Sequence, residues 1–245
     1  MPDSKIISAN QLTRKFGNFT AVDNITFDVN QGEIFGFLGA NGAGKTTAMR
    51  ILCGLLTPSS GSATVCGYNV ANQSELIKLN IGYMSQKFSL FDDLSVWDNI
   101  SFYAGIYKMS RNQIKDAGEE LLNKLELSQH KKKLVGSLPL GWKQKLAFAT
   151  AIIHKPRLVF LDEPTGGVDP ITRRAFWDML NSAASAGITV FVTTHYLDEA
   201  EYCDRISIMA KGKIGALGTP TELKEQFRVP SIYEVILALA RGNEA

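Results

Sequence analysis

The sequence contains few cysteines, and their number and spacing exclude a disulfide framework. Of 245 residues only three are cysteine, namely Cys53, Cys66 and Cys203. This odd count does not fit a disulfide-stapled domain, and the spacing does not fit a zinc ribbon. We interpret the three residues as reduced thiols, which are typical of a cytosolic protein.

Long apolar runs and an excess of charge of one sign are also missing. The most apolar windows, residues 146–153 and 235–240, fall well short of the roughly 20 residues that span a bilayer. The N-terminus has no basic start followed by an apolar run, so we expect no secretory signal. Lysine and arginine number 26 against 24 acidic residues, a net charge of +2 that gives no sign of nucleic-acid binding. We therefore expect a soluble chain without a nucleic-acid partner, whose membrane role, if any, comes through another protein.

The sequence does show an alternation of strand and helix patterns. Apolar runs at residues 158–161, 189–193 and 205–210 predict strands with helical stretches between them, which favours an α/β fold with a mainly parallel sheet. Short β-rich runs within residues 6–38, separated by glycine and asparagine turn signals, predict a small N-terminal sheet. From Leu94 to about His154 the apolar spacing becomes helical. We expect this helical block to be inserted into the sheet.

A glycine-rich motif lies between a continuously apolar strand pattern at residues 33–38 and a helical pattern over residues 45–56. Gly39-Ala-Asn-Gly-Ala-Gly44-Lys45-Thr46 matches G-x-x-x-x-G-K-[ST]. The glycines of this motif let backbone N–H groups surround phosphate oxygens, the lysine reaches the β- and γ-phosphates, and the hydroxyl can hold Mg²⁺. The N-terminus of the following helix favours the same anion. The predicted nucleotide-binding residues of this loop are Gly39, Asn41, Gly42, Ala43, Gly44, Lys45, Thr46 and Thr47.

Two carboxylates follow the apolar run Leu158-Val-Phe-Leu161. In open α/β sheets, ligands lie at the carboxyl ends of the strands, so we expect Asp162 to hold Mg²⁺ through water. Glu163, one residue further on, is placed to orient and deprotonate a water that attacks the γ-phosphate. Taken alone, this pair fits ordinary solvated acids equally well, and the phosphate loop in the same chain favours the catalytic interpretation.

The order of these elements resembles the ATP-binding subunit of an ATP-binding-cassette (ABC) transporter across nearly all 245 residues. GANGAGKTT resembles the family's Walker A loop, and LVFLDEP resembles its Walker B strand. By this resemblance, Gln86 is the Q-loop glutamine, which senses the γ-phosphate and Mg²⁺ and adjoins the transmembrane partner. Asp169 is similarly the D-loop aspartate at the dimer interface, and His195 is the switch histidine that contacts the γ-phosphate.

Two positions depart from the family pattern. The signature motif, commonly Leu-Ser-Gly-Gly-Gln, is here Leu138-Pro139-Leu140-Gly141-Trp142. Pro139 replaces the serine that would reach ATP on the opposite subunit, which leaves the N–H of Gly141 and the helix N-terminus to bind phosphate in trans. Phe16 stands where the family usually has the tyrosine that stacks on adenine. The alternatives are that Phe16 fills the core of the small sheet or that Phe19 is the stacking ring.

The resemblance implies a P-loop NTPase core with a mainly parallel sheet, an N-terminal antiparallel β subdomain and an inserted α-helical subdomain. We expect one ABC ATPase domain over residues 1–245. Residues 1–85 and 156–228 would form the core with the β subdomain, residues 86–155 the helical subdomain, and residues 229–245 a C-terminal helix.

The resemblance also implies ATP and Mg²⁺ as cofactors, and two kinds of partner. One is a second ABC ATPase subunit, in a homo- or heterodimer that sandwiches ATP. The other is a set of integral membrane permease subunits, which would hold the chain at the cytoplasmic face of the cell membrane. The apolar side chains expected to dock the permease, or else only to pack the helical subdomain, are Phe88, Leu90, Phe91 and Trp97.

The function that this resemblance implies is ATP hydrolysis that powers a membrane exporter of the drug- or antibiotic-efflux kind. Two alternatives remain at this point. In the first, the chain is a nucleotide-gated partner that binds ATP but hardly hydrolyses it, because of Pro139 and Trp142. In the second, it is a soluble ABC ATPase that acts outside transport.

Overall fold

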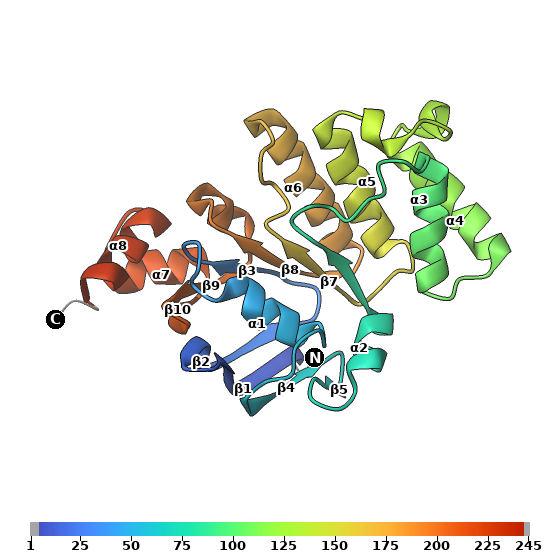
Figure 1. The fold of residues 1–245 in the computed structure, drawn as a ribbon. Helices are drawn as coiled ribbons and strands as arrows, with labels where there is room; N and C mark the ends of the chain where they lie inside the picture. Colours follow the sequence, from blue (N-terminus) through green and yellow to red (C-terminus); the bar gives the residue numbers. More distant parts are fainter. Residues whose placement is uncertain (1–4, 243–245) are drawn as a thin grey trace.

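A six-stranded, mainly parallel sheet forms the centre of the computed structural model, which describes residues 5–242 (Figure 1). The strands lie in the order β10-β9-β3-β8-β7-β6, and β10 pairs antiparallel with β9. Every residue of β3, β7 and β8 is buried, as expected for strands covered on both faces. The strand bounds are β3 (Ile34–Leu38), β6 (Ile81–Met84), β7 (Leu158–Asp162), β8 (Thr189–Thr194), β9 (Arg205–Ala210) and β10 (Lys213–Gly218).

A second, antiparallel sheet of four strands lies below the first in Figure 1, in the order β2-β1-β4-β5. It consists of β1 (Lys5–Phe16), β2 (Phe19–Asn30), β4 (Ser60–Val65) and β5 (Tyr68–Asn69). Helix α1 (Lys45–Leu52) lies between the two sheets (Figure 1), and a shared core of apolar side chains joins them. Among its members are Phe27, Phe35, Phe37, Met49 and Phe191. This is the predicted N-terminal antiparallel sheet.

Helices cover the other face of the parallel sheet. Helices α5 (Leu140–Ile152) and α6 (Pro170–Ser185) contribute to a second core, which also includes residues of α7 (Pro220–Phe227) and α8 (Ile232–Gly242). A short helix, α2 (Ser74–Asn80), precedes β6. This arrangement leaves the carboxyl ends of β3, β7 and β8 side by side, because these strands are parallel neighbours.

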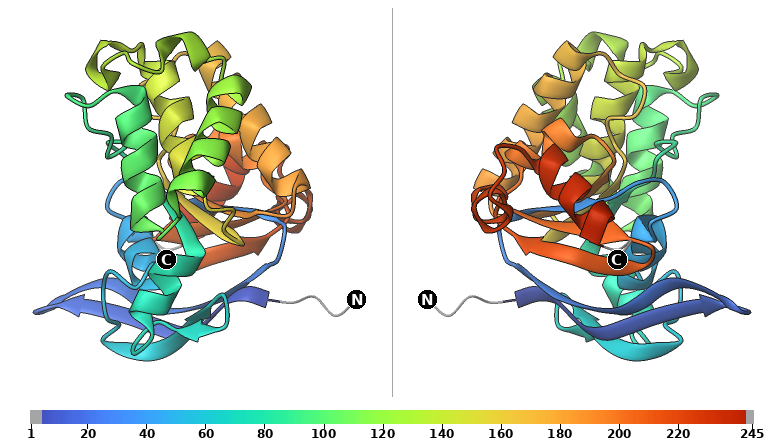
Figure 2. Two further views of the ribbon diagram at one scale, coloured as in Figure 1. Left: turned by 90° about the vertical axis from the view of Figure 1, so that its right-hand side faces the viewer. Right: turned by 90° about the vertical axis from the view of Figure 1, so that its left-hand side faces the viewer.

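Helices α3 (Val96–Ile106) and α4 (Arg111–Lys124) project beside α5, at the end of the molecule away from the antiparallel sheet (Figure 2). They have a third core of their own, in which Ile100 and Leu122 contact Leu146 of α5 and its neighbours. Both helices begin at a serine N-cap, Ser95 and Ser110, whose side chain accepts a backbone hydrogen bond. Single turns of 3₁₀-helix, η1 (Ser128–His130) and η2 (Val135–Ser137), lead into α5.

The first helix is shorter than the sequence pattern predicts. The apolar spacing extends to Leu56, but α1 ends at Leu52. Gly54 has a φ of 69°, and its N–H and that of Leu55 donate to the carbonyls of Ile51 and Arg50. This is the Schellman motif, which ends a helix at a glycine. The apolar residues Leu55 and Leu56 therefore belong to the turn that follows the helix.

Among residues 5–242, no helix is both long and apolar enough to cross a membrane. The parts of the predicted domain ranges at residues 1–4 and 243–245 lie outside the described residues.

Candidate functional site

The loop of residues 39–44 leaves β3 and enters α1 at the carboxyl edge of the parallel sheet. Gly42 and Gly44 have φ values of 81° and 104°, a region that favours glycine. A Cβ atom on Gly44 would collide with the carbonyl oxygen of Ala21, whereas one on Gly42 would meet open space. The loop therefore curls tightly against β2 and directs the start of α1 outward, which is the geometry of a phosphate cradle.

The side chain of Lys45 curls back over this loop. Its Nζ donates to the carbonyl oxygens of Gly39 at 2.7 Å and Ala40 at 3.2 Å, and the residue is only 4% exposed. It also lies 3.5 Å from Oε1 of Glu163. A buried ammonium group needs such partners, and they fix its charge at the mouth of the loop.

Two oxygen groups from different elements meet beside Lys45. The hydroxyl of Thr46 donates to Oδ1 of Asp162 at 3.2 Å, and Asp162 is buried at the end of β7. A carboxylate paired with a hydroxyl is the donor set that Mg²⁺ uses in phosphate-loop enzymes, so these residues fit the ion. Thr193 of β8 supports the pair, because its Oγ1 donates to the same Oδ1 at 2.8 Å.

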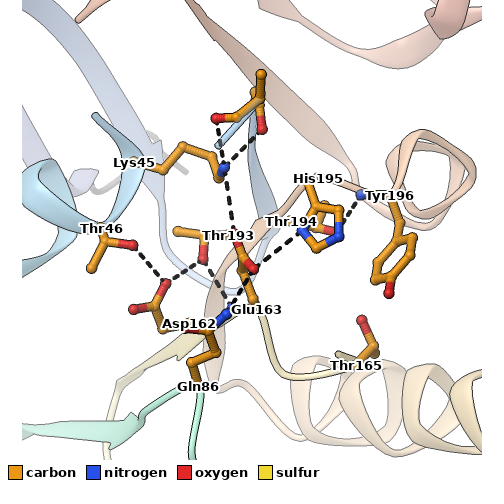
Figure 3. A network of polar contacts seen from close by, with 12 residues as sticks. Lys45, Thr46, Gln86, Asp162, Glu163, Thr165, Thr193, Thr194, His195 and Tyr196 are labelled. Atoms are coloured by element: carbon orange, nitrogen blue, oxygen red, sulfur yellow. Dashed lines mark hydrogen bonds and ion pairs between the residues drawn. The ribbon is translucent and has the colours of Figure 1, made fainter. Parts of the chain in front are cut away.

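Three polar side chains converge on Glu163 (Figure 3). Besides Lys45, Nε2 of Gln86 donates to Oε2 at 3.1 Å, and Nδ1 of His195 lies 3.1 Å from the same oxygen. Gln86 follows β6, Glu163 follows β7 and His195 follows β8, so parallel neighbouring strands bring together residues that are far apart in the sequence. The carboxylate is 12% exposed, which leaves it shielded yet reachable.

Several buried polar residues that belong to none of the predicted motifs also support this site. Gln144 of α5 donates to the carbonyl of Pro164 at 2.7 Å, and Thr165 donates to Glu199 at 2.6 Å. The exposed fraction of Gln144, Thr165 and Glu199 is 0%. No spacing rule reveals such pairs, although a polar residue within an apolar helix pattern, as at Gln144, was the available signal.

Phe16 lies at the end of β1, opposite Phe19 at the start of β2. The two residues are 45% and 64% exposed, and the guanidinium of Arg14 lies 4.7 Å from the centroid of the Phe16 ring. This exposure rules out the alternative that Phe16 fills the core of the small sheet. Both rings stay candidates for stacking on adenine.

The signature and D-loop residues are neighbours within this chain. Gly141 lies in the first turn of α5, where a Cβ atom would come 2.7 Å from Cγ2 of Thr172. Asp169 is the N-cap of α6 and accepts hydrogen bonds from the N–H groups of Ile171 and Thr172. These hydrogen bonds, with one from the Thr172 hydroxyl, lower the pKa of Asp169. The start of α5 and the start of α6 thus present an anion-attracting N–H face and a carboxylate side by side.

The phosphate loop, the strand-end carboxylates and the convergent glutamine and histidine define a nucleotide-binding P-loop site on an α/β sheet. A family model described as ABC transporter matches residues 22–166. The chain therefore belongs to the ABC transporter family and carries its ATP-binding domain, as the resemblance in the sequence predicts.

Individual relatives agree with this assignment. The chain is 47% identical over 228 residues to the probable multidrug ABC transporter ATP-binding protein YbhF of Escherichia coli K12, which covers 92% of this chain but 39% of that protein. It is 34% identical over 241 residues to the linearmycin resistance ATP-binding protein LnrL of Bacillus subtilis, which covers 98% of this chain and 77% of that protein. The chain thus spans less than half of the length of YbhF.

Solved structures confirm the predicted fold class. The ATP-binding subunit of an ABC transporter superposes with a TM-score of 0.86 at 26% identity, covering 96% of this chain and 99% of that one. CbiO1 of Clostridium perfringens, described as part of the ABC transporter complex cbiONQ, gives a TM-score of 0.82 at 28% identity, covering 98% and 97%.

Proposed function

We propose that the chain hydrolyses MgATP and thereby powers a membrane exporter of the drug- or antibiotic-efflux kind. The observation that carries this proposal is the convergence of Lys45, Gln86 and His195 on the carboxylate of Glu163. The names of YbhF and LnrL, which refer to multidrug transport and to resistance, support the export direction.

The phosphate loop and Lys45 bind the β- and γ-phosphates through backbone N–H groups and the ammonium charge. Thr46 and Asp162 would hold Mg²⁺, with Gln86 beside it, and the ion when bound neutralises phosphate charge. Thr47 follows in the first turn of α1, where the helix dipole also favours the anion. The side chain of Phe16 offers a ring face for adenine.

Glu163 orients the attacking water and accepts its proton, since its carboxylate lies beyond the phosphate-binding lysine at the carboxyl edge of the sheet. Gln86 donates to Oε2 of this carboxylate and so orients the base. Nδ1 of His195 lies 3.1 Å from the same oxygen without a hydrogen bond to it, which leaves the imidazole available for the γ-phosphate.

A second ABC ATPase subunit completes the site in this proposal. The N–H of Gly141 and the N-terminus of α5 act on ATP that is bound to the opposite subunit, and Asp169 lies at the interface. Pro139 carries no hydroxyl, so the contact in trans relies on backbone N–H groups, which are unpaired within the first turn of any helix.

Membrane permease subunits are the proposed second partner, and they would hold the chain at the cytoplasmic face of the membrane. Phe91, Phe102 and Ile106 are 40%, 45% and 52% exposed, and the rings of Phe91 and Phe102 meet edge to face at 4.8 Å. Leu90 and Asp92, the chain neighbours of Phe91, line a cleft of about 280 Å³ together with Gln86 and Leu140. Clustered exposed apolar groups are typical of a protein interaction site. Residues 86–155, the proposed helical subdomain, contain this surface.

The other expected docking residues are more enclosed. Trp97 packs against Gly118 and beneath the ammonium of Lys131, which lies 3.7 Å from its ring centroid. Phe88 and Leu90 are half-buried against the cores. The patch that we propose for docking is therefore Phe91, Phe102 and Ile106.

Co-purification with any transmembrane proteins that neighbouring genes encode tests the transport assignment. We expect the chain to associate with them in native detergent and to show ATPase activity in that complex. Phe102→Asp should abolish the association, whereas Ile171→Asp, at an 83% exposed position on α6, should preserve it. Failure of the unaltered chain to associate with any such protein would count against a transport role.

A further inference from the structure

A buried carboxylate lies behind the proposed catalytic groups. Glu199 belongs to η3 (Leu197–Tyr202), four residues after His195, and its exposed fraction is 0%. Its Oε1 accepts a hydrogen bond of 2.6 Å from the hydroxyl of Thr165, which is equally buried and follows Glu163 by two positions. Burying a carboxylate costs free energy unless the group is paired. The complete burial of Glu199 therefore suggests a specific role for this side chain.

Arg173 of α6 is the third member of the cluster. Its Nε lies 3.7 Å from Oε1 of Glu199, and its Nη1 donates to Oδ2 of Asp198 at 3.3 Å. Its guanidinium lies 4.0 Å from the ring centroid of Tyr196. The Tyr196 ring is in turn 4.3 Å from that of His195, centroid to centroid. Arg173 therefore contacts the segment that carries His195 at three points.

The cluster is not arranged for maximal stability. Within the described part of the chain, neither Nε of Arg173 nor Oε2 of Glu199 has a hydrogen-bond partner. A buried ion pair stabilises a fold only when its remaining donors and acceptors are satisfied. The presence of Arg173 and Glu199 is therefore better explained by a role in positioning neighbouring residues than by a contribution to stability.

The hydrogen bonds of the sheet cannot by themselves fix the two catalytic side chains. The pairing of β7 with β8 ends at Asp162 and Thr193, so Glu163 and His195 both lie just past the last paired residues. Figure 3 shows Thr165 and Tyr196 drawn beside them. The N–H of Glu163 donates to Thr193, and its carboxylate lies beside His195. A further tie between the two loops comes from side chains beyond the sheet.

We propose that Glu199 is a positioning residue that joins, through Thr165 and Arg173, the loop of Glu163 to the loop of His195. The inference rests on the proposed hydrolytic function, and it adds a set of residues that act through Glu163 and His195 without touching the nucleotide. When this connection is lost, the side chains of Glu163 and His195 no longer keep their relative orientation. The phosphate loop and Lys45 remain intact.

Steady-state ATP hydrolysis by the full chain tests this role through the separation of kcat from KM. We expect Glu199→Gln and Arg173→Met to lower kcat at least fivefold, with KM for ATP within twofold. Glu199→Gln should keep its thermal midpoint, whereas Arg173→Met should lower it, because Glu199 then loses its charged partner. The double variant should be no worse than either single one, and Arg173→Lys should recover part of kcat. Arg174→Met is the matched control, because Arg174 is the exposed next residue of α6 and contacts Tyr202 instead.

Three outcomes overturn the inference. Unchanged kcat in folded variants would show that the tie is not needed, and a joint fall of kcat, ATP affinity and thermal midpoint would show a purely structural role. Absence of hydrolysis by the unaltered chain would overturn the inference and the proposed function together. That result is distinguishable from hydrolysis that the variants leave unaffected, which overturns the inference alone.

Discussion

Glu163 adopts a backbone conformation that is unusual for a residue with a side chain. Its φ is 46°, in the left-handed region, which costs about 1–2 kcal/mol for most residues. Its N–H donates both to the carbonyl and to the hydroxyl of Thr193, and its carbonyl accepts from Gly166. These hydrogen bonds hold the strained residue in the conformation in which its carboxylate lies 3.5 Å from Nζ of Lys45.

Thr193 is therefore the residue on which both carboxylates depend. We predict that Thr193→Val, which keeps the shape but removes the hydroxyl, lowers kcat for ATP at least tenfold. It should also lower the free energy of unfolding by about 1–3 kcal/mol, because Asp162 loses a buried partner. Steady-state kinetics and urea unfolding measure the two effects.

Thr189→Val is the control for this change. Thr189 is also buried in β8, at the other end of the strand, and its hydroxyl accepts from the N–H of Gly32 at 2.8 Å. The control should lose similar stability and keep its kcat. Equal kcat in both variants would contradict the role of Thr193.

His154 gives the fold a specific sensitivity to acid. Burial lowers the pKa of its imidazole from an ordinary 6.5 to about 4, and its ring stacks on Tyr107 with centroids 3.4 Å apart. Between pH 6.5 and 4 the His154 imidazole binds a proton in the unfolded chain but not in the folded one. The free energy of unfolding therefore has its full value above about pH 6.5 and falls as the pH decreases from 6.5 to 4. Urea midpoints across this range should fall more steeply for the unaltered protein than for His154→Phe. Parallel curves would contradict the prediction.

At the scale of elements, α5 begins in an unusual way. Its N-cap is Pro139, which has no side-chain hydrogen bond to the first turn, and the preceding Leu138 is extended, as residues before proline generally are. Serine at this position caps a helix and, by the family resemblance, reaches the γ-phosphate on the opposite subunit. The variant signature thus keeps the helix dipole and lacks one hydroxyl contact.

Pro139→Ser should restore that contact. A hydrogen bond to a charged group contributes about 1.5–3 kcal/mol, so we predict that ATP-dependent dimerisation tightens by about tenfold or more. The measurement is the dimer dissociation constant from light scattering against protein concentration. Pro230→Ser, at an exposed position just before α8, is the control. An unchanged dissociation constant in Pro139→Ser would contradict the trans contact.

Elements that carry a strong pattern could be predicted from the sequence. The apolar runs of β3 and β7 are recognisable because both faces are buried, and the glycine loop joins a strand to a helix as its motif requires. Strand β4, with the sequence Ser-Gly-Ser-Ala-Thr-Val, is difficult to predict because small polar residues line it. The apolar spacing predicts an end of α1 beyond the observed Leu52, because it does not register the turn at Gly54.

Contacts between distant positions outside the motifs could not be predicted. Thr165 and Glu199 are 34 residues apart, and they meet only because β7 and β8 are parallel neighbours with adjacent ends. The convergence on Glu163 has the same origin. Motif order pointed to Lys45, Gln86, Glu163 and His195, which the structure brings together. The distances among them and the residues that support them depend on the tertiary structure.

Across the whole molecule, the two proposed partners would contact different surfaces. The site edge carries the phosphate loop together with the starts of α5 and α6, and the exposed patch of Phe91, Phe102 and Ile106 lies on the helical part. Helix α5 contributes both Gly141, near the proposed dimer interface, and Gln144, which donates to the carbonyl of Pro164 next to Glu163. It therefore connects the two regions. A movement of the helical part is therefore expected to reach the catalytic loop through one rigid helix.

The central claim is that Glu163 is the base of a composite ATP site formed by two subunits. Its most direct test compares ATP hydrolysis and ATP-dependent dimerisation of the unaltered chain with those of Glu163→Gln. We predict turnover by the unaltered chain, and an inactive variant that forms a stable dimer with ATP. If the unaltered chain binds ATP but neither hydrolyses it nor dimerises, even with its membrane partner restored, the claim is contradicted and the chain is a nucleotide-binding partner.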